Sequence, residues 1–295
     1  MGQTDETIEL IRGSSVLDLT DLVQHHVIAF DGFGAPPIRR LSERGPLQDG
    51  DSDIGFRLDP RTIRLQVYLY GLTGAGLHQR REALLGVLRP GVSADPVKLR
   101  YTYPSGVVRQ IDTHLSGGMT FNGGGRLRET MPEVIELRAA DPTWYDPTIT
   151  SVPFSASGGG SGFVFPLSTN FTFGGSTLAA STVITLDGNN AWKTYPIITI
   201  TGPVVNCTIL NTSTGEKLQF PATIGAGKVY TIDTRYGQKT VVDELGANKI
   251  AELSSDSNLA TFHLEPGDNS ISTSGTSTTS ATGIAFQFNP RFLGV

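Results

Sequence analysis

The sequence predicts a mainly β protein made of two domains, with a single α-helix. The chain has 295 residues, which is long for one hydrophobic core because single cores stop growing near ~250 to 300 residues. Residues 1–150 carry 16 Lys and Arg with 19 Asp and Glu, whereas 151–295 carry seven and nine together with 37 Ser and Thr. These two compositions predict a first domain at 1–147 and a second at 148–295.

The first domain is expected to be a mostly antiparallel sheet covered by one helix. From Thr62 to Tyr70, aliphatic and polar residues alternate with the period of a half-buried strand. Leu77, Leu84, Leu85 and Leu88 follow with helical spacing before Pro90-Gly91, which predicts a helix at about 76–89. Three more strands are expected, at Val97–Tyr103, Gly106–Leu115 and Val134–Ala139.

A long connection at about 31–60 separates the start of this domain from its first clear strand. It is rich in Gly, Pro, Arg and Asp, and it is expected to lack regular structure. Most connections are ~4 to 6 residues, so one of this length is more often functional or a contact arm. We therefore expect it to project and to contact a neighbouring subunit, with Arg44, Gln48, Asp49 and Gly50 as the contact residues.

The second domain is expected to be a β-sandwich. Short apolar runs are separated by turn sequences such as Asp187-Gly188 and Pro266-Gly267, and none has helical spacing. The expected strands are Val183–Leu186, Ile197–Thr201, Cys207–Leu210, Leu218–Phe220, Val229–Asp233, Leu259–Leu264 and Ile284–Phe288.

The boundary between the domains is marked by two prolines and a glycine-rich stretch. Pro142 and Pro147 disfavour helix in the residues before them. Asp141, Pro142, Trp144 and Tyr145 are thus the expected interdomain junction, and Ser157–Gly162 is the expected flexible loop.

Catalytic, metal and cofactor sites are not expected. The five histidines have no ligand spacing, and the single cysteine, Cys207, lies in an apolar run typical of a buried thiol. The net charge of −5 gives no overall field that attracts nucleic acid. The N-terminus lacks the pattern of a secretory leader, and no apolar run is long enough to span a membrane, so membrane insertion is not expected.

Aromatic residues of the second half offer a binding alternative. Trp192, Tyr195 and Tyr236 are candidates for glycan contact, since ring faces stack on sugar C–H surfaces. For the two tryptophans, Trp144 and Trp192, packing in the core or between domains is the competing interpretation. A β-sandwich glycosidase is the third reading, and it needs two carboxylates ~5 to 10 Å apart, which a sequence does not place.

The order of motifs along nearly the whole chain resembles the distal tail proteins of long, non-contractile-tailed phages. In the first half, the resemblance rests on the start of the strand at Leu58–Ile63, on the Leu77–Leu88 helix with its Arg89-Pro90-Gly91 stop, and on the segment Ala140–Tyr145. In the second half it rests on five further segments, namely Tyr195–Ile197, Ile209–Leu218, Tyr230–Gly237, Phe262–Asn269 and Phe288–Phe292.

The resemblance implies a structural virion protein rather than an enzyme. Members of this family form a hexameric ring at the tail tip. By this resemblance the N-terminal domain is expected to be β-sandwich-like with one helix and to make the ring, and a galectin-like or carbohydrate-module-like C-terminal sandwich is expected to point outward. The implied partners are other copies of the chain, the tail tube protein, the tail-tip hub protein and a fibre or receptor-binding protein. DNA is expected to pass through the ring without specific binding, and assembly is expected in the host cytoplasm.

Overall fold

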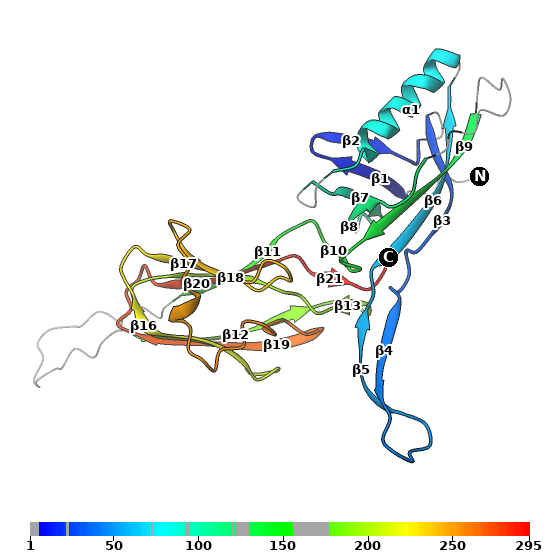
Figure 1. The fold of residues 1–295 in the computed structure, drawn as a ribbon. Coiled ribbons are helices and arrows are strands. Elements are labelled where there is room, and N and C mark those ends of the chain that lie inside the picture. The colour runs from blue at the N-terminus through cyan, green and yellow to red at the C-terminus, as the bar shows by residue number, and fades with distance from the viewer. Residues whose placement is uncertain are drawn as a thin grey trace, which may run out of the picture. The chain divides into compact units, whose positions relative to one another are not determined.

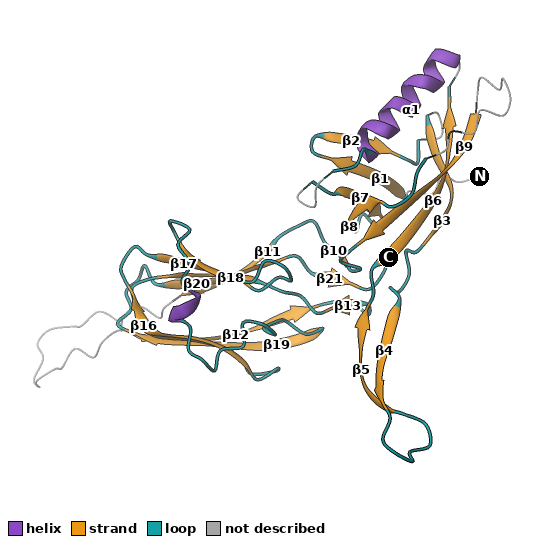
Figure 2. Cartoon of the chain, viewed as in Figure 1, coloured by secondary structure: helices purple, strands orange, loops and turns teal. Residues whose placement is uncertain are grey.

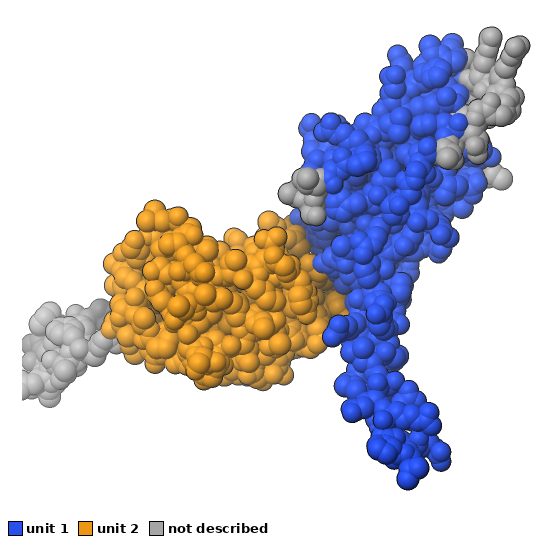
Figure 3. Space-filling model, viewed as in Figure 1, with its two compact units in different colours: residues 1–147, 292–295 blue, residues 148–291 orange. Residues whose placement is uncertain are grey.

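The protein forms two compact units, as Figure 3 shows in two colours. The structure, a computed structural model, describes residues 6–21, 24–71, 73–91, 95–119, 121, 130–155 and 177–295. Unit 1 comprises 1–147 together with 292–295, and unit 2 comprises 148–291. The second domain was predicted to be 148–295, whereas the last four of these residues lie with unit 1. The expected loop at Ser157–Gly162 lies outside the described residues.

Unit 1 is built on antiparallel strands, and Figure 2 shows them with the one helix. One run of paired strands has the order β21-β10-β8-β7-β1-β2, and β3, β6 and β9 join it through the pairing of β9 with β8. The bounds are β1 Thr7–Arg12, β2 Ser15–Asp18, β3 His25–Asp31, β6 Arg61–Tyr70, β7 Val97–Thr102, β8 Val108–Leu115, β9 Thr130–Ala139, β10 Trp144–Tyr145 and β21 Arg291–Phe292.

Strand β6 supplies the centre of the unit 1 core. Its alternate residues Ile63, Leu65, Val67 and Leu69 are all fully buried. Ile63 pairs with Leu137 and Leu65 with Ile135 on β9, so aliphatic side chains meet across the strands on one face. The period-two prediction for 62–70 is confirmed, and the strand begins one residue earlier, at Arg61.

Helix α1 spans Gly74–Leu88 and packs on β1, β2 and β6. Thr73 caps its first turn, because its hydroxyl oxygen accepts a hydrogen bond from the Gly76 amide at 3.0 Å. Leu77, Leu84 and Leu88 are buried as predicted, but Leu85 is 45% exposed, and Val87 takes the expected buried place instead. The apolar stripe is therefore rotated by part of a turn from the predicted one.

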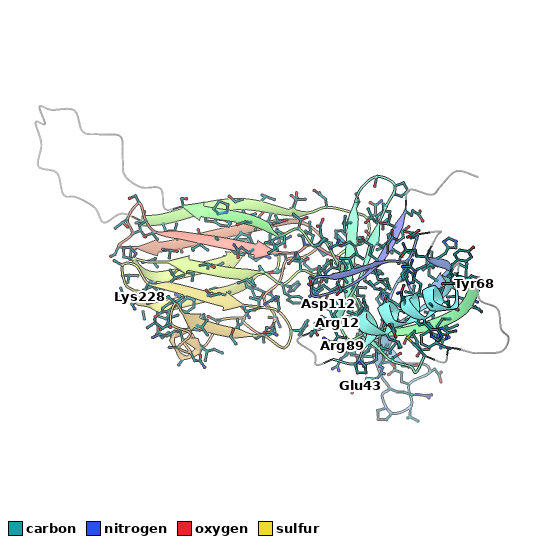
Figure 4. The ribbon with its side chains drawn as sticks, turned by 90° about the horizontal axis from the view of Figure 1, so that it is seen from above. Arg12, Glu43, Tyr68, Arg89, Asp112 and Lys228 are labelled. Carbon is teal, nitrogen blue, oxygen red and sulfur yellow. The ribbon has the colours of Figure 1, made fainter. Side chains whose placement is uncertain are left out.

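A buried arginine closes the C-terminal end of α1. The Arg12 guanidinium donates to the carbonyl oxygens of Val87 and Arg89 and to the Asp95 carboxylate at 2.9 Å. The last carbonyls of a helix have no partner inside it, and a cation there also suits the helix dipole. Figure 4 shows Arg12 and Arg89 at this end of the helix, so strand β1 and the helix end are held by one side chain.

Unit 2 is a sandwich of two antiparallel sheets (Figure 1). One sheet has the order β11-β20-β14-β17-β18 and the other β12-β19-β15-β16. Buried residues from both sheets, such as Ile198, Phe286, Ile209 and Ile271, belong to one hydrophobic cluster. The bounds are β11 Thr150–Ser155, β12 Thr177–Leu186, β13 Ala191–Trp192, β14 Ile197–Thr201, β15 Val204–Asn211, β16 Glu216–Ile224, β17 Val229–Asp233, β18 Thr240–Asp243, β19 Gly267–Thr276 and β20 Gly283–Phe288, with a short 3-10 turn at Ile250–Glu252.

One predicted strand of unit 2 is wrong, and the strands β11, β13, β18 and β19 were not predicted. Residues 259–261 form a turn in which the Phe262 amide donates to the Asn258 carbonyl, and only Leu264 makes a β-bridge, with Thr194. Phe262 and Leu264 are buried in the core. The apolar residues of this segment therefore anchor a loop in the core. Among the strands not predicted, β19 is disguised by its Ser and Thr content, since the buried Thr273 hydroxyl donates to the Ala180 carbonyl and needs no water.

Two fully buried asparagines lie on the neighbouring strands β15 and β19. The Asn211 side-chain amide donates to Asn269 Oδ1 at 3.2 Å and to the His263 carbonyl at 3.1 Å. Asn269 in turn donates to the carbonyls of Glu265 and Ile184. Because every buried polar group needs a partner, this network fixes one arrangement of the 263–269 segment. Both residues lie in segments that carry the family resemblance.

Helices long and apolar enough to cross a membrane do not occur among the described residues. The mainly β prediction, with one α-helix, is confirmed.

The buried His25 should make unit 1 less stable in mild acid. Burial is the main cause that lowers its pKa below 6.5, so the folded chain binds a proton less readily than the unfolded chain. The free energy of unfolding is therefore expected to fall as the pH drops below 6.5, until the folded-state pKa is passed. Urea denaturation of His25→Gln at pH 7.5 and 5.5 should show a smaller loss between the two pH values than the unsubstituted chain.

The two tryptophans allow this measurement to be made on unit 1 alone. Trp144 lies in unit 1 and Trp192 in unit 2, so Trp192→Phe leaves fluorescence from unit 1 only. His114→Gln, on strand β8 of the same unit, is the matched control. If the His25→Gln and unsubstituted chains lose equal stability between the two pH values, His25 is not the cause of the acid sensitivity.

Candidate assembly surface

The segment expected to lack regular structure is a β-hairpin. Strands β4, Ile38–Glu43, and β5, Ser52–Leu58, pair only with each other and form a two-stranded sheet. This corrects the prediction for 31–60, where Gly, Pro and charged residues concealed a strand pair. We call residues 35–60 the arm, and Figure 1 shows it extending away from the other strands of unit 1.

The arm leaves apolar side chains in solvent. Ile38 is 53% exposed, Ile54 63% and Phe56 46%, and Leu47 at the tip is fully exposed. A two-stranded hairpin is at best marginally stable in water when nothing covers it. Its apolar side chains are therefore typical of a surface that packs against a partner.

The two faces of the arm differ in chemistry. Ile38 pairs with Leu58 and Arg40 with Phe56, so these four side chains share one face. The Arg40 guanidinium lies 5.7 Å from the centre of the Phe56 ring. We call this face the apolar face of the arm.

The opposite face carries Arg39 and Arg57 in register with each other. Like charges directly opposite one another destabilise a strand pair. Arg39 forms an ion pair with Asp59 at 3.1 Å. Both side chains of that pair are partly exposed to water, so the pair contributes little to stability. The electrostatics of the isolated arm therefore do not compensate for its exposed apolar area.

The predicted contact residues lie at the tip of the arm. The Arg44 Nε donates to the Gln48 carbonyl, and the Gln48 side chain accepts from the Gly45 amide and donates to Ser52. Asp49 and Gly50 follow in the same turn, where Gly50 has a φ of +76°. The structure thus brings Arg44 and Gln48 together in a closed turn, and their contact with a neighbour stays a prediction.

Both ends of the arm meet at Arg61, a fully buried arginine at the start of β6. Its guanidinium donates to the carbonyls of Gly32 at 2.8 Å, Gly34 at 2.6 Å and Pro142 at 2.9 Å, and also to the Leu293 carbonyl. Burial lowers its pKa to about 10, so the side chain remains charged at neutral pH. We call Gly32, Gly34 and Arg61 the arm root.

Two glycines near Arg61, Gly32 and Gly294, leave little or no room for a side chain. Gly32 has a φ of +85°, and a Cβ there would lie 2.3 Å from the Thr62 carbonyl oxygen. A Cβ on Gly294 would lie 3.0 Å from the carbonyl oxygens of Phe33 and Gly34. Sequence reasoning missed this site, although an arginine placed directly before a buried aliphatic strand was the available signal.

The predicted junction residues lie within unit 1. Trp144 is fully buried, and its ring centre is 5.3 Å from that of Phe33 beside the arm root. The Tyr145 hydroxyl donates to Asp112 and accepts from Gln110 on β8. Asp141 accepts from the Thr143 hydroxyl, and Pro142 supplies a carbonyl to Arg61. These residues thus fasten the chain to unit 1 just before it leaves for unit 2.

Two of the three glycan candidates meet in unit 2. The ring centres of Tyr195 and Tyr236 are 4.8 Å apart at a steep angle, and Tyr236 is 70% exposed. The Lys239 ammonium lies 5.5 Å and 5.1 Å from the two ring centres. Trp192 belongs to β13, and its carbonyl accepts from the Thr194 hydroxyl. The structure therefore gives an aromatic pair beside a cation, and its role in glycan contact stays a prediction.

Clusters of three or more His, Cys, Asp or Glu side chains able to hold a metal ion are absent from the described part of the chain. Cys207 is fully buried, and burial raises its thiol pKa to about 12, which disfavours the reactive thiolate.

Comparison with known proteins confirms the resemblance to phage tail components. Residues 188–292 match the family model described as the siphovirus-type tail component, C-terminal domain. This match lies almost entirely in unit 2. Comparison with curated proteins gave no sequence match.

Solved structures extend the likeness to the whole chain. The crystal structure of SPP1 Dit, described as a paradigm of the hub adsorption apparatus in phages infecting Gram-positive bacteria, aligns with a TM-score of 0.63 and 16% identity. The alignment covers 96% of this chain and 98% of that one. A chain of the phage P2 baseplate in its activated conformation with Ca aligns with a TM-score of 0.53 and 13% identity, covering 98% and 99%. At these identities the likeness shows a shared fold.

Replacing Arg61 should destabilise unit 1 strongly. Lysine keeps the charge but lacks the planar fork of donors, so it leaves buried carbonyls unsatisfied. We expect Arg61→Lys to lower the free energy of unfolding of unit 1 by about 2 to 4 kcal/mol. Denaturation followed by Trp144 fluorescence in the Trp192→Phe background measures this change.

Arg64→Lys is the matched control for that experiment. It makes the same substitution on the same strand, but Arg64 is exposed and pairs with Glu136 at 3.0 Å. Its effect should stay within about 0.5 kcal/mol. Equal effects of the two substitutions would show that Arg61 has no special structural role.

Proposed function

We propose that this chain is a structural component of a phage tail tip, a distal tail protein whose unit 1 assembles into a ring. The observation that carries the proposal is the exposed arm on a chain whose full length shares the SPP1 Dit fold. A virion location follows from this role. In the finer form of the proposal the ring contains six copies and joins the tail tube to the tail-tip hub and to fibre or receptor-binding proteins.

The arm supports a ring because it makes a heterologous contact. One surface, the apolar face, meets a different surface on the next copy, and such head-to-tail contacts close into rings when the rotation permits. Burying Ile38 and Phe56 would offset the marginal stability of the arm, at roughly 1.5 to 3 kcal/mol for each side chain that becomes fully buried. Each copy would donate one arm and receive one, so no arm would remain uncovered.

The proposed role needs no covalent chemistry. The ring would hold neighbouring tail proteins and leave an opening for DNA. The net charge of −5 supports passage without capture, because tight DNA binding depends on phosphate contacts by Lys and Arg. Assembly in the host cytoplasm is part of the same proposal.

Polar substitution on the apolar face of the arm should weaken assembly. We expect Ile38→Ser with Phe56→Ser to reduce the association constant at least about tenfold, because loss of a buried anchor at an interface costs ~2 kcal/mol. Native mass spectrometry of the full chain over a range of concentrations measures this effect. The control pair is Val183→Ser with Leu245→Ser, which changes exposed aliphatic residues of unit 2.

A second variant separates the tip of the arm from its face. Residues 44–51 are replaced by Asn-Gly, a two-residue turn that joins the register partners Glu43 and Ser52. Weaker assembly would assign the contact to the tip residues Arg44, Gln48, Asp49 and Gly50. An unchanged ring in both arm variants would contradict a role of the arm in assembly.

Carbohydrate binding by unit 2 is the second candidate function, favoured by the meeting of Tyr195 and Tyr236 across 41 positions of sequence. A glycan array probed with the full chain tests it. Tyr236→Ala should abolish any signal, whereas Tyr68→Ala, at an exposed tyrosine of unit 1, should not. The absence of any bound glycan, or equal binding by both variants, would reject this function.

A further inference from the structure

Four chain segments that lead to different parts of the molecule converge on Arg61. The arm leaves the rest of unit 1 after Gly34 and returns through Asp59 and Pro60 directly into Arg61. Unit 2 begins after Pro147, five residues beyond Pro142, and the chain re-enters unit 1 at Phe292, next to Leu293. Arg61 donates to carbonyls of the arm root and of both connections.

Further contacts join the same segments without Arg61. The Val295 amide donates to the Phe33 carbonyl at 3.1 Å, and Asp59 donates its amide to the Pro37 carbonyl at 2.9 Å. Phe33 also packs against Trp144, between the arm root and the outgoing connection. The C-terminal residues therefore lie directly on the arm root.

A buried guanidinium restricts how these segments move. Its donors are shielded from water, which could otherwise replace a lost acceptor. A carbonyl that moves away therefore leaves an unsatisfied charged group, which is strongly unfavourable. A displacement of the arm root is therefore accompanied either by movement of Pro142 and Leu293 or by loss of their hydrogen bonds. The arm and the two connections thus share one element, the Arg61 guanidinium. Coupling between two parts of a protein requires such a shared element.

We infer that Arg61 couples the arm to the two connections that carry unit 2, so that fixing the arm on a neighbouring subunit restrains residues 140–147 and 290–295. This inference rests on the proposed function for the event that fixes the arm. The coupling itself is a property of the single chain and is tested before assembly. Arg61 acts here as a positioning residue, since it is fully buried and acts through the segments whose carbonyls it holds.

The test fixes the arm with a disulfide instead of a neighbour. Ile38→Cys and Leu58→Cys place a cysteine pair on register partners near the arm root, and the buried Cys207 stays out of the reaction. Hydrogen exchange of the full monomeric chain is compared between the oxidised and reduced forms. We expect oxidation to slow exchange in peptides 140–147 and 290–295 at least about fivefold, the lower end of typical coupling between sites.

Arg61→Lys in the same cysteine background should reduce that slowing to less than twofold, and Arg64→Lys should leave it intact. A fivefold effect that persists in Arg61→Lys would overturn the inference, and so would the lack of any effect with Arg61 present. If Arg61→Lys does not fold, the pattern in the unsubstituted background decides. Slowing confined to the two peptides supports coupling, and uniform slowing that includes 97–115 contradicts it.

Ring formation is measured separately by native mass spectrometry. Coupling in a chain that forms no rings would keep this inference and reject the proposed function. Rings without coupling would do the opposite.

Discussion

A buried positive charge must find acceptors for its donors, and in this protein that requirement organises the first unit. Arg61 lies in the core side of a strand whose neighbours Ile63, Leu65 and Val67 are fully buried. Its four carbonyl acceptors come from positions 32, 34, 142 and 293, which are far apart in sequence. The arm, the departure to unit 2 and the return of the C-terminus can therefore occupy only places that satisfy one guanidinium.

The same constraint explains why an exposed hairpin can be presented to a partner. A hairpin with Ile38 and Phe56 in water has little to hold its position if its ends are free. Both of its ends are instead fixed where the core begins, so less conformational freedom remains to be lost on association. Part of the cost of ordering the interface is thus met during folding of the single chain.

Much of the fold follows from local patterns, and the exceptions have physical causes. The alternation of Ile63, Leu65, Val67 and Leu69 fixed β6, and Leu77, Leu84 and Leu88 marked α1, because one buried face suffices for both elements. Strand β19 escaped prediction because its buried positions hold Thr273 and Asn269, whose polar groups are satisfied by distant partners. A strand was wrongly predicted at residues 259–264, because Phe262 and Leu264 are apolar in order to anchor a loop in the core.

The position of the arm in the sequence was predictable, but its hairpin structure was not. The length of the 31–60 segment indicated a contact arm, whereas its strand pairing depends on a register that Gly55 and the bulge near Leu41 conceal. The role of Arg61 could not be read from neighbours in sequence, since its acceptors lie up to 232 positions away. Trp192, Tyr195 and Tyr236 were grouped by residue type; two of these rings, Tyr195 and Tyr236, are in contact, and the Lys239 ammonium beside them was not foreseen.

A direct image of the assembled protein would test the central claim that the arm makes the contact between subunits. Single-particle cryo-electron microscopy of purified full-length chain at high concentration should show closed rings. In each ring the side of the arm that carries Ile38 and Phe56 should be covered by the adjacent copy. Closed rings whose arms project into solvent on both faces, joined through some other surface, would contradict the account.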